Sequence, residues 1–399
     1  MAEPFSREEV QRRWSKTRHL MAAAGLNAIL ATSFPACYWL SGAPVHPFGR
    51  PLGTLLPVDA EPAMIVSIIE RAHLESQSWI DDRRYYWDYN PEPRYEHPRP
   101  PLHSLAQRLG ELLAERGLTR ARLGIEEAVL PAGALDLLRS ALPEVAFQPA
   151  SELLASARRT LSDEELRLLR AADDVCDVGQ EVLIEQLAAG RTARDIWDAS
   201  RARMMDVIVE RYPEYPFGMR IHTGLESPRR GSGHSEWIAW EAKASPRQGQ
   251  VLTTGVDVLF WGYQGNVERT VVVGTPTPQV RAEFDVMVDA NETAIAAVRP
   301  GVRLADVDRA CKDVFTRHRF GTRSGSGLGR GIVSYEANAR DPGMDVRLYA
   351  DAVLEPGMAF SIEPDLLSEG RTYRHCNTLI VTPSGAEVDS RLPRGVLVV

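Results

Sequence analysis

The stretch Val251–Val273, VLTTGVDVLFWGYQGNVERTVVV, predicts a β-hairpin that has a charged residue inside one of its strands. Apolar residues alternate with small or polar ones up to Phe260, which is typical of a strand with one buried face. Glycine and asparagine favour tight turns, so we expect the chain to turn at Gly265–Asn266. Glu268 then lies in the second strand. Its carboxylate either faces water at a sheet edge or is buried, and a buried carboxylate must be paired, hydrogen-bonded or used in chemistry.

The composition describes a globular protein of two domains. The chain has 399 residues, of which 44% are hydrophobic and 25% charged, and this length favours two domains. A net charge of -8 gives no basic patch, which argues against a nucleic-acid partner. The charged N-terminus and the lack of a run of about 18 apolar residues argue against a signal peptide or membrane span. We therefore expect a cytoplasmic protein, with four cysteines that are reduced and do not have zinc-site spacing.

The first 157 residues predict a small α/β domain. Ser6–Glu9 has the pattern of a helix-capping box, and the predicted helix runs to about residue 24. Beyond it, short apolar runs that predict strands alternate with amphipathic runs that predict helices. The runs Ala28–Thr32 and Cys37–Leu40 are expected to be strands, and Ile80–Pro101 a long surface loop.

The second domain is predicted to span residues 158–399 and to begin with another capping box, Ser162–Glu165. Helices are followed by strands, then by two long helices at Gln279–Val298 and Leu304–Arg319, and then by strands again. This order predicts an α+β domain in which helices cover one face of an antiparallel sheet.

His234 is the candidate proton carrier. It lies in the polar loop RRGSGHSEW, and an imidazole with an ordinary pKa near 6.5 can accept and return a proton. A surface histidine without a role is the alternative. Together with Gly262–Thr270 (GYQGNVERT), Ser361–Pro364 (SIEP) and Tyr373–His375 (YRH), this motif resembles the pita-bread family of methionine aminopeptidases, prolidases and creatinases. The resemblance runs over nearly the whole chain and is strongest to the creatinases.

The resemblance implies that this chain lacks a metal centre. The metallopeptidases of the family bind two metal ions through two aspartates, a histidine and two glutamates. Matched by motif, these positions hold Gly255, Asn266, Leu328, Glu363 and His375. One carboxylate among five positions cannot offset the dehydration of two cations, and only Asp257 on the same strand could compensate. We therefore expect no metal and no other cofactor.

The resemblance to creatinases also assigns roles to residues in both domains. His234 matches their catalytic histidine, and Glu268 matches the glutamate that faces the substrate guanidinium. Phe48 and Arg50 match a motif that reaches into the neighbouring subunit's site and holds the substrate carboxylate, which implies a homodimer. The other predicted substrate-binding residues are Arg340, a second carboxylate ligand, Glu363, and three positions that depart from creatinases: Gln264, Leu328 and His375.

These residues predict a metal-independent hydrolase of a C–N bond in a small carboxylate-bearing guanidino or amidino substrate. The arginines would hold the carboxylate, Glu268 the nitrogen, and His234 would act as general base and acid. Four alternatives stay open: a hydrolase of cyclic amidines similar to ectoine hydrolase, with Glu268 attacking covalently; a lyase; a catalytically inactive binding protein; and, least favoured, a metal-dependent Xaa-Pro dipeptidase. The loop with Trp237 and Trp240 could reshape the pocket or simply pack.

Overall fold

The computed structural model describes residues 5–43, 50–87, 100–213, 221–226, 243–320 and 352–399. It divides into two compact units, a first unit of Glu3–Arg159 and a second unit of Thr160–Val399. The predicted boundary after residue 157 falls two residues before this division.

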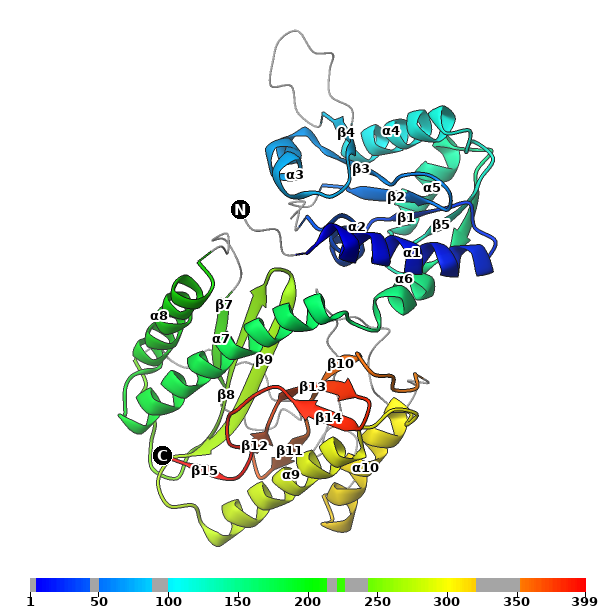
Figure 1. The fold of residues 1–399 in the computed structure, drawn as a ribbon. Helices are drawn as coiled ribbons and strands as arrows, with labels where there is room; N and C mark the ends of the chain where they lie inside the picture. Colours follow the sequence, from blue (N-terminus) through cyan, green and yellow to red (C-terminus); the bar gives the residue numbers. More distant parts are fainter. Residues whose placement is uncertain (1–4, 44–49, 88–99, 214–220, 227–242, 321–351) are drawn as a thin grey trace. The chain divides into compact units, whose positions relative to one another are not determined.

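The first unit is the predicted α/β domain (Figure 1). Its six strands form one mixed sheet in the order β4-β3-β2-β1-β5-β6. The strands β1, β2 and β3 are buried along their whole length, as expected for a sheet covered on both faces. Leucines of α4 pack on this sheet and form its main core. The strands are β1 (Ala28–Ala31), β2 (Gly53–Pro57), β3 (Ala63–Ser67), β4 (Asp82–Tyr86), β5 (Arg122–Ile125) and β6 (Ala146–Pro149). The helices are α1 (Arg7–Ala23), α2 (Phe34–Ser41), α3 (Arg71–Gln77), α4 (Pro101–Glu115), α5 (Ala132–Ala141) and α6 (Ser151–Arg158), with the 3₁₀ turn η1 (Ile68–Glu70).

Two local predictions for the first unit are wrong. Cys37–Leu40 belongs to helix α2, which begins where the Ser33 hydroxyl accepts the N–H of Ala36 and ends at Gly42, with φ of 73°. A four-residue apolar run fits a strand or a buried helix equally well, so these caps decide between them. Within the predicted loop Ile80–Pro101, β4 pairs in parallel with β3, while residues 88–99 lie outside the described structure.

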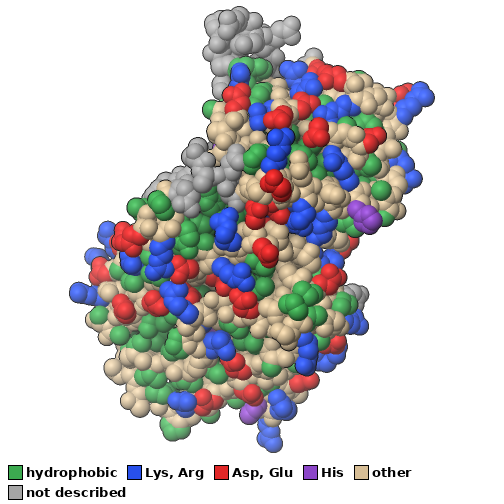
Figure 2. Space-filling model, in the orientation of Figure 1, with side chains coloured by type: hydrophobic (Ala, Val, Ile, Leu, Met, Phe, Trp, Pro, Cys, Tyr) green, Lys and Arg blue, Asp and Glu red, His purple; other side chains and the backbone are tan. Residues whose placement is uncertain are grey.

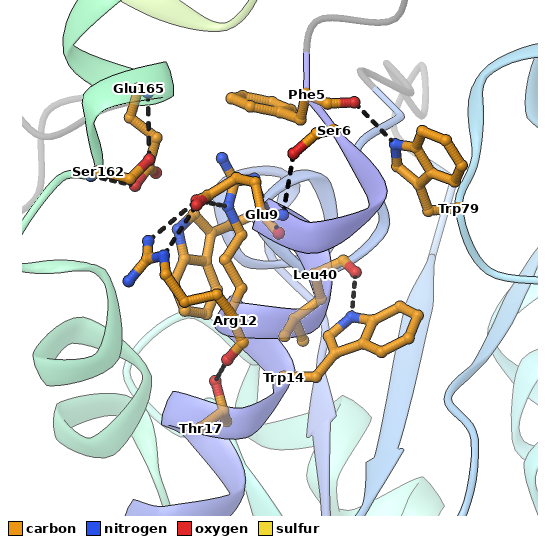
Figure 3. Close-up of polar contacts among 12 residues, drawn as sticks. Phe5, Ser6, Glu9, Arg12, Trp14, Thr17, Leu40, Trp79, Ser162 and Glu165 are labelled. Atoms are coloured by element: carbon orange, nitrogen blue, oxygen red, sulfur yellow. Dashed lines mark hydrogen bonds and ion pairs between the residues drawn. The ribbon is translucent and has the colours of Figure 1, made fainter.

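The start of α1 shows how the chain's first described residues are held (Figure 3). The Ser6 hydroxyl accepts the N–H of Glu9 at 3.1 Å, as the capping pattern predicts. The Glu9 carboxylate in turn accepts from Arg12 at 2.8 Å, and the carbonyl of Phe5 accepts from the Trp79 indole at 3.2 Å. The bond from Glu9 to Ser6 satisfies an N–H that a helix start would otherwise leave without a partner.

The second unit is the predicted α+β domain. Helix α7 packs on β8 and β9, and α9 packs on the strands near the C-terminus (Figure 1). One sheet has the order β15-β9-β8-β7 and another β10-β13-β14, while β11 and β12 form a hairpin. The helices are α7 (Asp163–Ala188), α8 (Ala193–Arg211), α9 (Pro278–Ala297) and α10 (Leu304–Arg317). The strands are β7 (Ile221–Glu226), β8 (Val251–Phe260), β9 (Tyr263–Val272), β10 (Ala359–Ile362), β11 (Asp365–Ser368), β12 (Arg371–Arg374), β13 (Asn377–Thr382), β14 (Gly385–Val388) and β15 (Leu397–Val398).

The central hairpin is present, but it turns four residues earlier than predicted. Phe260 pairs with Tyr263, and the two-residue turn between them has φ of 49° at Trp261 and 82° at Gly262. Gly265 lies inside β9 instead, because a Cβ there would come within 2.6 Å of the backbone of Ala172 on α7. This glycine therefore serves the close approach of a helix and a strand, which no local turn pattern reveals.

Positive and negative side chains intermingle on the face of the molecule shown in Figure 2. This is the pattern of an ordinary solvated surface. In the part of the chain that the structure describes, no helix combines the length and the apolar character that crossing a membrane requires.

Candidate functional site

Strands β8 and β9 present one polar face. Gly255 pairs directly with Glu268, and Asp257 with Asn266. Residues opposite each other, or two apart along a strand, point to the same face. Gln264, Asn266 and Glu268 therefore share a face of β9; Gln264 is half-buried, and the other two are buried.

Three side chains from distant parts of the second unit meet on this face. The carboxylates of Glu268 and Glu363 and the thiol of Cys376 have ligand atoms that all lie within 4.8 Å of one another. Glu268 comes from β9, Glu363 directly follows β10, and Cys376 directly precedes β13. Their exposed fractions are 3%, 6% and 0%. We call these three residues, with Arg374, the acidic cluster.

The backbone fixes two members of the acidic cluster against each other. The N–H of Glu268 donates to the Cys376 carbonyl at 3.3 Å, and the N–H of Cys376 donates to the Glu268 carbonyl at 3.1 Å. The Arg269 guanidinium donates to the same two carbonyl oxygens, at 2.8 and 3.0 Å. Burial lowers the pKa of Arg269 to about 10, so it stays charged at neutral pH. The two side chains therefore project from a rigid junction between β9 and β13.

Arg374 joins the two carboxylates of the acidic cluster. Its Nε lies 2.5 Å from Oε2 of Glu268, and its Nη1 lies 3.3 Å from Oε1 of Glu363. Arg374 is two residues before Cys376, so both side chains reach the same side of the extended chain. A buried carboxylate needs a cationic or hydrogen-bonding partner, and Arg374 is the cationic partner of both Glu268 and Glu363.

The thiol of Cys376 is a protonated member of the acidic cluster. Burial, and then the charges of Glu363 and Glu268, raise the pKa of Cys376 well above its usual value. The Nδ2 of Asn266 donates to its sulfur at 3.4 Å. A thiol in this state can accept and donate weak hydrogen bonds, but it supplies no thiolate for nucleophilic attack.

His375 was predicted to be a site residue, but it lies outside the acidic cluster, and the next residue, Cys376, lies in the cluster instead. Its Nδ1 accepts the N–H of Thr270 at 3.3 Å, and its Nε2 lies 3.2 Å from the carbonyl oxygen of Gly395. Burial and the nearby charge of Arg269 lower the pKa of His375 to about 3, so the ring is neutral. Successive residues of extended chain point to opposite sides, and the residue on the cluster side is Cys376.

The described residues do not fit the two-metal centre of the family's metallopeptidases. Gly255 has no side chain to offer, and the amide of Asn266 donates to the thiol. Glu268, Glu363 and Cys376 could surround one ion by their spacing, but Arg374 pairs with both carboxylates. A cation would have to displace this guanidinium or share its carboxylates against charge repulsion. Asp257 is not among the residues grouped around that position in the described structure.

Several predicted site residues cannot be placed in the acidic cluster. Arg50 belongs to the first unit, is half-buried and lines a cavity of about 340 Å³ together with Phe34 and Leu52. Phe48, His234, Leu328 and Arg340 lie outside the described residues, as do Trp237 and Trp240. Their roles remain predictions.

Two residues that the sequence reasoning did not assign to the site, Arg374 and Cys376, are central to it. The signal that could have found them is the spacing Arg-x-Cys just before a predicted strand, which puts both side chains on one face. The sequence comparison matched the last metal-ligand position of the metallopeptidases to His375. The side chain of His375 points to the face of the chain opposite the one that carries Arg374 and Cys376.

Comparison with known proteins confirms the family resemblance. The model of metallopeptidase family M24 matches residues 167–383, and that of the creatinase/prolidase N-terminal domain matches residues 13–160. Creatinase of Bacillus sp. (strain B-0618) is 22% identical over 98% of this chain and 92% of its own length. Ectoine hydrolase of Halomonas elongata is 24% identical over 99% and 98%. The crystal structure of the prolidase from Pyrococcus horikoshii OT3 has the same fold, with a TM-score of 0.76 and 19% identity over 96% of this chain and 99% of that one. The chain therefore belongs to metallopeptidase family M24 and has the family's pita-bread fold, preceded by a creatinase/prolidase N-terminal domain.

Proposed function

We propose that this protein is a metal-independent hydrolase that cleaves a C–N bond in a small carboxylate-bearing guanidino or amidino substrate. Similarity over nearly the full length to a creatinase and to an ectoine hydrolase supports a hydrolase of this kind. The same family contains a relative named Xaa-Pro dipeptidase, so the choice between these activities depends on the site.

The charge of the acidic cluster carries the proposal. Two carboxylates and one guanidinium, all nearly inaccessible to solvent, give the acidic cluster a formal excess of one negative charge. A substrate amidinium or guanidinium carries one positive charge and several N–H donors, so it would complete the balance. A carboxylate has about four acceptor sites, so Glu268 can bind such a group while it pairs with Arg374.

The remaining roles follow from the sequence. His234 takes a proton from a water molecule while the water oxygen attacks the substrate carbon that lies between the nitrogens. As the C–N bond breaks, His234 gives that proton to the departing amine. Arg50 and Arg340 hold the substrate carboxylate with forked donors. Positioning of the reactants and stabilisation of the developing charge would supply most of the reduction of the barrier.

The test is turnover of creatine, guanidinoacetate and ectoine, followed as urea, ammonia or ring opening, by wild type and by Glu268→Gln and His234→Ala. Each variant should lose at least about 100-fold in kcat/KM. Glu210→Gln, which changes an exposed carboxylate that pairs with Arg203 on the surface of α8, is the matched control and should retain wild-type activity. Full activity of Glu268→Gln on an accepted substrate would remove Glu268 from the mechanism.

A cyclic amidine substrate is the second candidate, favoured by the likeness to ectoine hydrolase. In that reaction a carboxylate oxygen of Glu268 would bond to the ring carbon between the two nitrogens while one ring C–N bond breaks and its nitrogen takes up a proton. Water would then hydrolyse this O-acyl imidate and return Glu268 to its carboxylate form. Mass spectrometry of rapidly quenched enzyme should find the substrate's mass on the peptide containing Glu268.

A reaction in H₂¹⁸O distinguishes a hydrolase from a lyase, because a lyase would incorporate no ¹⁸O into the product. A catalytically inactive binding protein would show ligand-dependent thermal stabilisation without turnover.

The predicted sharing of Arg50 between subunits has its own test. Arg50→Ala and His234→Ala are each expected to be inactive, and a mixture that has exchanged subunits should recover part of the activity. Exchange is verified with differently tagged chains. If mixed dimers form without activity, Arg50 does not act across the interface.

A further inference from the structure

Two aspartates that the proposed mechanism does not use face each other beside the acidic cluster, and Asp173 is buried while the Asp389 side chain is 10% exposed. Asp173 lies on α7, and Asp389 directly follows β14. Their carboxyl groups lie close enough to each other for a hydrogen bond once one of them is protonated. In each, Oδ2 is shielded from solvent and accepts no hydrogen bond from any N–H or O–H donor of the described residues. Two carboxylate oxygens cannot hydrogen-bond unless a proton lies between them.

The other oxygen of Asp173 binds the two strands that carry the cluster. Its Oδ1 accepts the backbone N–H of Asn266 on β9 at 3.2 Å and the hydroxyl of Thr378 on β13 at 3.1 Å. Asn266 is two residues before Glu268, and Thr378 is two residues after Cys376. One carboxyl group therefore ties β9 to β13 close to the point where Glu268 and Cys376 pair.

The charges around the two aspartates favour a single shared proton. Asp177, on α7, and Glu387 add negative charge, whereas Arg170 lies 3.8 Å from Oδ1 of Asp389. Burial, followed by the charge of Asp389, raises the pKa of Asp173 well above its usual range. Asp173 is the more deeply buried of the two, and Asp389 is the one beside a cation. Asp173 therefore holds the proton and donates it to Asp389.

We propose that Asp173 and Asp389 share one proton and that protonated Asp173 is a positioning residue, which holds β9 and β13 in the register that the acidic cluster requires. Loss of the proton would place two like charges in contact inside the protein. The hydrogen bonds by which Asp173 joins β9 to β13 would then weaken. As a result, the side chains of Glu268 and Cys376 would be held less precisely relative to each other. This inference does not depend on the identity of the substrate.

Infrared spectroscopy of the full chain tests the shared proton. A protonated carboxylic acid has a C=O stretching band distinct from that of carboxylates, and wild type should retain this band at neutral pH. Asp173→Asn and Asp389→Asn should each lose it, since either amide can replace the shared proton with an N–H donor. Asp174→Asn, the next residue on α7, is the matched control and should keep the band. A wild-type spectrum without the band at neutral pH would overturn the proposal.

Amide hydrogen exchange tests the positioning role. The peptides that contain Glu268 and Cys376 should lose protection in wild type as the pH rises from about 5 to about 9, after correction for the intrinsic rate. The same peptides of Asp173→Asn should keep their protection, because the amide carries no titrating proton. A peptide from α4 serves as internal reference. Equal loss of protection in wild type and Asp173→Asn would show that the pair does not hold the strands.

Discussion

The Nε of Arg374 lies 2.5 Å from a carboxylate oxygen of Glu268, and neither side chain is more than 4% exposed. Removal of one partner of such a pair leaves the other charge buried without compensation. Arg374→Gln should therefore lower the free energy of unfolding by about 3–5 kcal/mol, measured by urea denaturation. Arg194→Gln is the control, because Arg194 pairs with Asp198 at the surface, and its replacement should cost less than about 1 kcal/mol. Similar losses in both variants would contradict the role of burial.

Removal of metal ions should leave the protein unchanged, because Arg374 already pairs with both carboxylates that a cation would need. We expect dialysis against a chelator to shift neither Tm nor turnover, and elemental analysis to find metal far below one ion per chain. Activation of Xaa-Pro dipeptide cleavage by Mn²⁺ or Co²⁺ would instead support the metallopeptidase alternative.

His375 should make the protein less stable in acid. Its pKa in the folded protein is lowered to about 3, below the value near 6.5 of an unfolded chain. The stability that its neutral form contributes is complete above about pH 6.5 and is lost as the pH falls towards 3, at up to about 1.4 kcal/mol per pH unit. The difference in unfolding free energy between wild type and His375→Gln should shrink accordingly between about pH 7 and about pH 4.

The exposed His103 provides the comparison for this measurement. His103→Gln should follow the wild-type curve at each pH. A constant difference between wild type and His375→Gln over the same range would show that His375 is not held neutral.

Glu283 on α9 should be a major anchor of the β11–β12 hairpin. Its carboxylate accepts from the hydroxyls of Tyr373 at 2.5 Å and Ser368 at 2.7 Å, and from Arg371 at 3.0 Å. In Glu283→Gln an NH₂ group would face some of these donors, and the negative charge opposite Arg371 would be lost. We expect a loss of about 2–4 kcal/mol in urea denaturation.

Asp285→Asn is the matched control for Glu283→Gln. Asp285 lies on the exposed side of the same helix and pairs with Arg281 at the surface. Its replacement should cost less than about 1 kcal/mol. An equal loss in the two variants would assign no special role to the buried network.

Local chemistry made much of the fold predictable, and distant contacts limited the prediction of the site. The capping box at Ser162 forms as expected, because its two hydrogen bonds join residues three positions apart. The hairpin turn was misplaced because Gly265 is required by Ala172, which lies far away in sequence. The choice of His375 over Cys376 failed for a related reason: which side of the chain faces Glu268 depends on the pairing of β9 with residues beside β13.

The acidic cluster also bears on the order in which the protein folds. The hydrogen bond from Arg269 to the carbonyl of Cys376 spans 107 positions of sequence. Contacts at such separation require the closure of a long loop, and its entropy is lost before the contact stabilises the chain. We therefore expect the junction of Glu268 and Cys376 to form after the β8–β9 hairpin, so that protection of the Cys376 amide in pulse-labelling experiments would mark a late stage of refolding.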